Sequence, residues 1–130
     1  MGKEDYVSLE VAKLLKEKGF DKRCEQRFVE KIDGTEREGW DDDLCAICEV
    51  SDVIYYPKPT LYEAQKWLRS KKIYVLAQPA KESGVTVWYY QVVNDNDPDD
   101  MFYTTSQDTY PNYETALNEG IKYALNSFEL

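Results

Sequence analysis

Histidine is absent from this 130-residue chain, and cysteine occurs only three times. A serine triad therefore lacks its usual base, and a zinc site lacks its commonest nitrogen ligand. The sequence also contains no G-x-S-x-G, no P-loop and no G-x-G-x-x-G. We expect no enzyme, with no catalytic, cofactor-binding or metal-binding residues.

Long hydrophobic runs are missing as well. No stretch approaches the ~20 apolar residues that a membrane helix needs. The first residues, Met1-Gly2-Lys3-Glu4-Asp5, are charged and lack the Ser or Thr of a myristoylation site. We expect no signal peptide, no membrane association and a cytoplasmic location.

Positive charge is in deficit, with a formal net charge of −9. Residues 32–56 hold one basic and eight acidic residues, and residues 94–130 hold the same numbers, whereas residues 57–93 hold six basic and two acidic ones. A solvated acidic surface is the simplest interpretation. The alternative is an anionic nucleic-acid mimic that inhibits a DNA- or RNA-binding protein, which requires the two acidic segments to form one surface.

What is present is apolar and aromatic material, at 42% and 14% of the residues, with eleven tyrosines. That content is too high for a disordered chain, and the length suits one domain over residues 1–130. Tyrosine is also favoured at protein interfaces.

The clearest local signal is an amphipathic helix near the C-terminus. Its apolar residues recur with helical spacing at Tyr113, Ala116, Leu117, Ile121, Ala124, Leu125 and Phe128. Asn118, Glu119, Lys122 and Asn126 form the opposite face. Gly120 costs ~1 kcal/mol in a helix but lies on the apolar side, so we expect it to let the helix approach a sheet closely.

Two further helices have capping signals. Ser8 is a suitable N-cap for a helix over residues 9–18, and Gly19 can take the left-handed position after it. Thr60 and Glu63 have the spacing of a capping box, which predicts a helix that continues to about Ser70.

The remaining segments predict strands. These are residues 23–32 and 44–56, separated by a loop over 33–43, followed by residues 73–78, 85–93 and 101–105, with a connection over 79–84. The sequence thus predicts a single α+β domain, an antiparallel sheet with about three packed helices in the order α-β-β-α-β-β-β-α.

Cys45 and Cys48 form a C-x-x-C motif, and Cys24 is the only other cysteine. A three-cysteine metal site completed by Asp or water is chemically possible, but structural zinc usually takes four ligands. Redox pairs sit at helix N-termini, whereas this motif has strand-like flanks. We expect reduced, buried or half-buried thiols.

Acidic clusters imitate a calcium site without completing it. The run Asp95-Asn96-Asp97-Pro98-Asp99-Asp100 begins like an EF-hand loop, but the sixth and twelfth positions are Asp100 and Ser106 instead of Gly and Glu. We expect a solvated turn there, and the same at Asp41-Asp42-Asp43.

The order helix, three strands, helix from Thr60 onward is that of double-stranded RNA-binding domains. Those domains place lysines at the start of the last helix, where this chain has Asn112-Tyr113-Glu114. Because negative charge there opposes phosphate binding, we expect no direct contact with nucleic acid.

Three segments suggest a family: residues 6–20 (YVSLEVAKLLKEKGF), 59–69 (PTLYEAQKWLR) and 113–121 (YETALNEGI). They resemble a family of small uncharacterised proteins of gut Bacteroidetes genomes and prophages. The resemblance implies a phage or mobile-element setting and supplies no activity, cofactor or site residue. The leading hypothesis is a non-catalytic accessory factor that binds an unidentified protein partner. No pattern indicates the oligomeric state.

Overall fold

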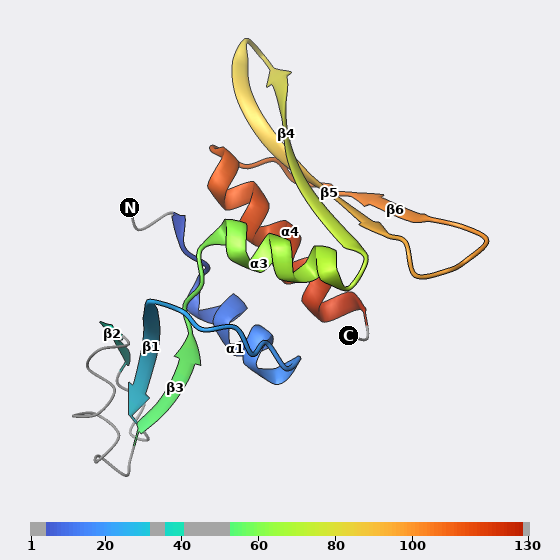
Figure 1. Ribbon diagram of the computed structural model, residues 1–130. Coiled ribbons are helices and arrows are strands. Elements are labelled where there is room, and N and C mark those ends of the chain that lie inside the picture. The colour runs from blue at the N-terminus through green and yellow to red at the C-terminus, as the bar shows by residue number, and fades with distance from the viewer. Residues whose placement is uncertain (1–4, 32–35, 41–52, 129–130) are drawn as a thin grey trace.

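The computed structural model describes residues 5–31, 36–40 and 53–128 of the chain. The described helices are α1 (Leu9–Glu17), α3 (Leu61–Ser70) and α4 (Tyr113–Ser127). Strands β1 (Gln26–Lys31), β2 (Glu36–Trp40) and β3 (Val53–Pro57) form one antiparallel sheet in the order β2-β1-β3. Strands β4 (Ile73–Glu82), β5 (Val85–Asn94) and β6 (Phe102–Thr105) form a second, in the order β4-β5-β6. The predicted α+β class, with antiparallel strands and three helices, is confirmed (Figure 1).

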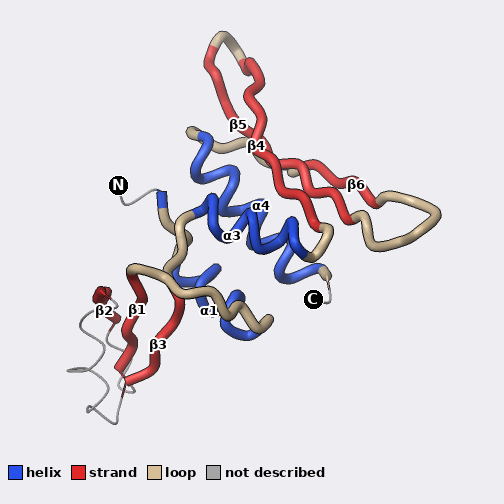
Figure 2. The backbone as a smooth tube through the Cα atoms, viewed as in Figure 1, coloured by secondary structure: helices blue, strands red, loops and turns tan. Residues whose placement is uncertain are grey.

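The structure corrects the sheet arrangement in two respects. The strands make two sheets with the helices between them, where we predicted one (Figure 2). Strand β2 also lies within residues 33–43, which we predicted as a loop. Its sequence, Glu36-Arg37-Glu38-Gly39-Trp40, has no apolar alternation, so only its backbone pairing with β1 identifies it. Most of the predicted strand over 44–56 lies outside the described residues, and its end is β3.

The β4–β5 hairpin is longer than predicted, because its connection is only a two-residue turn. Ser83 and Gly84 have φ of 51° and 81°, the left-handed geometry that suits a tight hairpin. Pro79 lies within β4, opposite Trp88. The N–H and C=O of Trp88 face away from Pro79 and bond to Tyr110, at 2.9 and 2.7 Å. The ladder therefore needs no N–H from Pro79, whose own backbone faces the open edge of β4.

The helix caps form as predicted. The Ser8 hydroxyl accepts from the Val11 N–H at 3.3 Å, and Gly19 takes φ of 89° after α1. The Thr60 hydroxyl accepts from the Glu63 N–H at 3.1 Å, while the Glu63 carboxylate accepts from the Thr60 N–H at 2.9 Å. Each cap satisfies amide groups that the first turn of a helix leaves without partners.

The core lies between the helices and the inner face of the second sheet. Most of the predicted apolar stripe of α4 is buried: Ala116, Leu117, Ile121, Ala124 and Leu125 are at most 2% exposed, whereas Phe128 is half-buried and Tyr113 is 39% exposed. They pack with the buried residues of α1 and α3 and with those of β4 and β5. None of the described helices is long and apolar enough to cross a lipid bilayer.

Gly120 brings α4 close to the second sheet, as predicted. A Cβ added at Gly120 would lie 2.7 Å from Val75 Cγ1 and 2.9 Å from Tyr90 Cβ. Both distances are shorter than carbon atoms tolerate, so a side chain here would force the helix and sheet apart.

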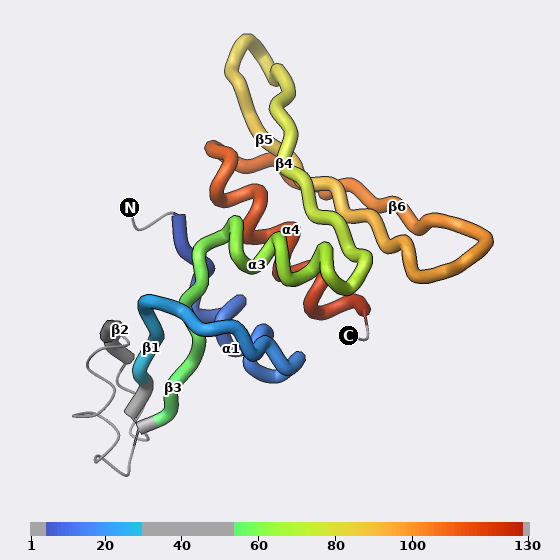
Figure 3. Tube along the Cα trace, viewed as in Figure 1, coloured from blue at the N-terminus to red at the C-terminus, as the bar shows by residue number. Residues whose placement is uncertain are grey.

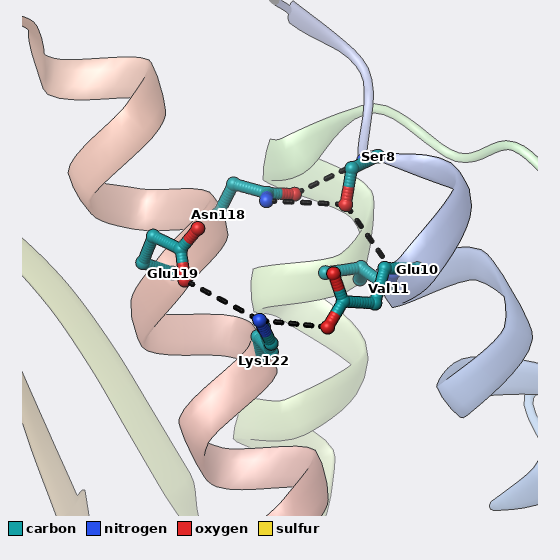
Figure 4. A network of polar contacts seen from close by, with 6 residues as sticks. All are labelled: Ser8, Glu10, Val11, Asn118, Glu119 and Lys122. Carbon is teal, nitrogen blue, oxygen red and sulfur yellow. Dashed lines mark hydrogen bonds and ion pairs between the residues drawn. The ribbon is translucent and has the colours of Figure 1, made fainter.

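Helix α1 contacts α4 although the two are far apart in sequence (Figure 3). The Asn118 Oδ1 accepts from the Ser8 N–H at 3.0 Å, and its Nδ2 donates to the Ser8 hydroxyl at 3.2 Å (Figure 4). Lys122 forms an ion pair with Glu10 at 2.7 Å. The polar side of α4 therefore joins the two ends of the described chain.

Candidate functional site

The second sheet has one covered face and one open face. Helices α3 and α4 pack on the side that carries Ile73, Val75 and Val92, which are at most 1% exposed. Because side chains alternate along a strand, the intervening residues project to the opposite side. The strand registers pair them in rows, such as Leu76 with Gln91 and Val93 with Tyr103. No described helix packs on this side (Figure 1), where Val93 is nevertheless buried, at 8% exposed.

Large apolar side chains occupy this open side. We call the following residues the outer face: Tyr74, Leu76, Val85, Val87, Tyr89, Met101 and Tyr103. Leu76 is 42% exposed, Val85 62% and Tyr103 59%. An antiparallel sheet with one solvated face normally alternates apolar and polar residues, so apolar side chains on the solvent side are unusual. Clustered exposed apolar groups of this kind mark interaction surfaces.

Several side chains on the open side are held in place by hydrogen bonds. The Tyr89 hydroxyl donates to Gln78 Oε1 at 2.9 Å, and Gln78 Nε2 donates to Gln91 Oε1 at 3.2 Å. The Tyr103 hydroxyl contacts Met101 Sδ at 3.2 Å. Side chains that are already ordered lose less conformational entropy when a partner binds.

Acidic residues border the outer face at both ends. Glu82 lies at the tip of the hairpin, and Asp95, Asp97, Asp99 and Asp100 lie in the β5–β6 connection. The predicted turn over 95–100 is confirmed: Asp97 Oδ1 accepts from the Asp99 N–H at 2.9 Å, and Asp100 Oδ1 from the Met101 N–H at 2.8 Å. Within the described ranges, no three His, Cys, Asp or Glu residues are grouped to hold a metal ion.

The open edge of β4 is unsuited to adding another strand. Pro79 offers no N–H on that edge, and Lys81 places a charge beside it. Proline and lysine are the residues that protect edge strands from pairing with other chains.

The cysteine prediction is tested at one position only. Cys24 is buried, at 7% exposed, and its Sγ lies 3.6 Å from the Lys22 carbonyl oxygen. Cys45 and Cys48, together with Asp41-Asp42-Asp43, lie outside the described residues.

The N-terminus of α4 has the chemistry that the sequence predicted. Asn112 Oδ1 accepts from the Thr115 N–H at 2.8 Å, and Glu114 lies in the first turn. The positive end of the helix dipole thus already has an acidic neighbour, which disfavours a bound phosphate there.

Comparisons of the chain with protein-family models, with curated proteins and with solved structures gave no match. The resemblance to a family from gut Bacteroidetes and their prophages stays a prediction. The outer face was not predicted, because Val85-Thr86-Val87-Trp88-Tyr89-Tyr90 has apolar residues on both of its sides. A signal was present in the sequence: this strand is apolar on both faces, and the predicted helices could cover only one of them.

Proposed function

We propose that this chain is a non-catalytic protein-binding domain whose partner packs on the outer face. The observation that supports the proposal is the exposure of Leu76 and Tyr103 at nearby positions of a sheet face on which no described helix packs, with Val85 exposed on the same face at the hairpin turn. Tyrosine is frequent among the residues that dominate binding energy, and exposed aliphatic groups gain from removal from water. The phage or mobile-element setting comes from the sequence resemblance and belongs to the same proposal.

The charges around the outer face define the chemistry of the partner. Glu82 and the four aspartates of the β5–β6 connection border it. A partner with an apolar centre and a basic rim complements this surface, and opposite charges would speed the encounter at low salt. We therefore propose a basic protein as the partner, in preference to a second copy of this acidic chain.

The test compares two double variants. Leu76→Ser with Tyr103→Ser removes apolar groups from the outer face, whereas Tyr62→Ser with Lys66→Gln alters exposed residues of α3 as a control. The host protein captured by the wild-type chain is purified, and its Kd is measured by calorimetry with each variant. We expect the outer-face variant to bind at least about tenfold more weakly, since truncation of two central residues costs more than 1.4 kcal/mol. The control should bind like the wild type.

Three outcomes would contradict the proposal. Equal affinity of both variants would show that the partner binds elsewhere. Self-association in ultracentrifugation that the outer-face variant abolishes would show that the occupant is a second copy. Recovery of no partner, together with turnover on a substrate panel, would favour an enzyme.

The nucleic-acid mimic has weaker support. The acidic β5–β6 connection is exposed, but the basic end of α3 lies against it. Asn96 Nδ2 donates to the Lys71 carbonyl oxygen at 3.0 Å, and the Asp95 N–H donates to the Lys72 carbonyl oxygen at 2.9 Å. Two basic residues therefore adjoin this acidic connection through their backbones. Most of the other acidic segment lies outside the described residues, so the mimic stays a prediction.

A further inference from the structure

Met101 is the sulfur-bearing residue of the outer face. The chain contains two methionines, and the other is Met1. Met101 is 41% exposed, and its backbone is held in place by Asp100, whose Oδ1 accepts from the Met101 N–H at 2.8 Å. Because exposed thioethers are open to oxidation, this residue is the point of the outer face that a small oxidant can modify.

A hydrogen bond links the Met101 sulfur to the exposed ring of Tyr103. The Tyr103 hydroxyl donates to Met101 Sδ at 3.2 Å, and Tyr103 is 59% exposed. A thioether sulfur is only a weak acceptor. An oxygen bonded to Sδ is a much better acceptor, so the Tyr103 hydroxyl would bond to that oxygen instead and the ring would move with it. Oxidation at one atom therefore changes two residues of the outer face.

The surroundings of Met101 favour a small, neutral oxidant. A cavity of about 480 Å³ lies beside it, and Asp97, Asp100, Phe102 and Tyr103 are among the residues that line this cavity with Met101. A space of this size admits a molecule as small as hydrogen peroxide. The two carboxylates repel anionic oxidants and leave a neutral hydroperoxide free to approach.

We propose that Met101 is an oxidation site that regulates the outer face, with a hydroperoxide as the oxidant. The Met101 sulfur attacks one peroxide oxygen, so that an S–O bond forms while the O–O bond breaks. The sulfur loses two electrons and becomes a sulfoxide, and the leaving oxygen takes up the proton and departs as water when the oxidant is hydrogen peroxide.

The sulfoxide should weaken binding of the partner, an inference that rests on the proposed function of the outer face. Oxidation puts a polar group where the partner would meet an apolar one, and a polar group costs free energy when it is buried without a hydrogen bond. Methionine sulfoxide reductases reverse the modification, so the same surface can return to its binding form.

The experiment treats the whole chain with hydrogen peroxide and then with dithiothreitol, which restores thiols but not methionine. Peptide mass spectrometry locates the added oxygen, and calorimetry gives the Kd of the purified host partner before oxidation, after it, and after treatment with the reductases. We expect binding to weaken by about tenfold on oxidation and to recover with the reductases. A saturating amount of partner should slow the oxidation of Met101, because both need the same face. Circular dichroism should give the same Tm for the reduced and oxidised chains.

Met101→Leu is the matched control, since it keeps Met1 and all three cysteines but lacks the reactive sulfur. Its own Kd sets the reference, and that Kd should be the same before and after peroxide. Met101→Gln places a polar amide at the same position without any oxidant. It should bind the partner more weakly than Met101→Leu does.

Failure of this inference can be told apart from failure of the proposed function. If Leu76→Ser with Tyr103→Ser weakens binding but the oxidised wild type binds like the reduced one, the outer face stands and regulation by Met101 is wrong. Resistance of Met101 to peroxide, or equal weakening in Met101→Leu, would also overturn it. If the outer-face variant binds like the wild type, the proposed function is wrong and the regulation of that face is wrong with it.

Discussion

Replacement of Gly120 by alanine tests how closely α4 approaches the second sheet. Helix propensity alone predicts a gain of about 1 kcal/mol, because alanine restricts the unfolded chain and suits a helix interior. Packing predicts a loss, since the new methyl would lie 2.7 Å from Val75 Cγ1 and 2.9 Å from Tyr90 Cβ. The Tyr90 Cβ is fixed to its backbone, and the β-branched Val75 side chain has little freedom to rotate.

The packing term should exceed the propensity term. Insertion of a methyl group into a filled core costs about 1–3 kcal/mol, and two rigid contacts place this site in the upper part of that range. We therefore expect Gly120→Ala to lower the free energy of unfolding by about 1–2 kcal/mol, measured by urea denaturation. Asn126→Ala, at an exposed position of the same helix, is the control and should be neutral or raise it by a few tenths of a kcal/mol.

A double-mutant cycle identifies the cause. Val75→Ala removes the nearer contact atom, so the cost of Gly120→Ala should be smaller in that background. If Gly120→Ala instead raised the free energy of unfolding by about 1 kcal/mol, propensity would dominate, and α4 could not lie as close to β4 and β5 as described.

Two further predictions concern the contact between α1 and α4 and the response to alkali. Ser8→Ala and Asn118→Ala should each lower the free energy of unfolding by about 1 kcal/mol, since Ser8 caps α1 and Asn118 accepts from the Ser8 N–H. They should couple by about 0.5 kcal/mol in a double-mutant cycle, because Asn118 Nδ2 donates to the Ser8 hydroxyl; strict additivity would refute that hydrogen bond. Burial, followed by the neighbouring Tyr110 and Tyr123, raises the pKa of Tyr90 above its ordinary value of 10.0. Since deprotonation is easier in the unfolded chain, the contribution of Tyr90 is complete below pH 10 and is lost as pH rises through its folded pKa. The free energy of unfolding of Tyr90→Phe should therefore fall less steeply above pH 10 than that of the wild type. Identical pH profiles of the two proteins would contradict the raised pKa of Tyr90.

The parts of the fold that the sequence predicted depend on local chemistry. Ser8 and the pair Thr60 and Glu63 cap their helices through atoms only three residues apart, so a short window contains the whole signal. The apolar stripe of α4 is equally local. The prediction missed strand β2 because its residues show no apolar alternation, and only backbone pairing with β1 identifies it. We predicted that the strand would end before Pro79. The strand continues because the backbone of Trp88, which lies opposite Pro79, bonds to Tyr110 and needs no N–H from the proline.

The sequence did not predict the outer face for a different reason: whether a strand face is exposed depends on which elements pack against it. An apolar residue in β5 has the same local pattern whether a helix packs on it or a partner does. Val85 is 62% exposed and Val92 is fully buried, although both lie in one strand of similar residues. The difference arises because Val92 lies on the face against which α3 and α4 pack, whereas Val85 lies on the opposite face at the turn end of the hairpin. The proposed binding surface is therefore a property of the packing between elements, which is why the search for catalytic motifs along the sequence could not reveal it.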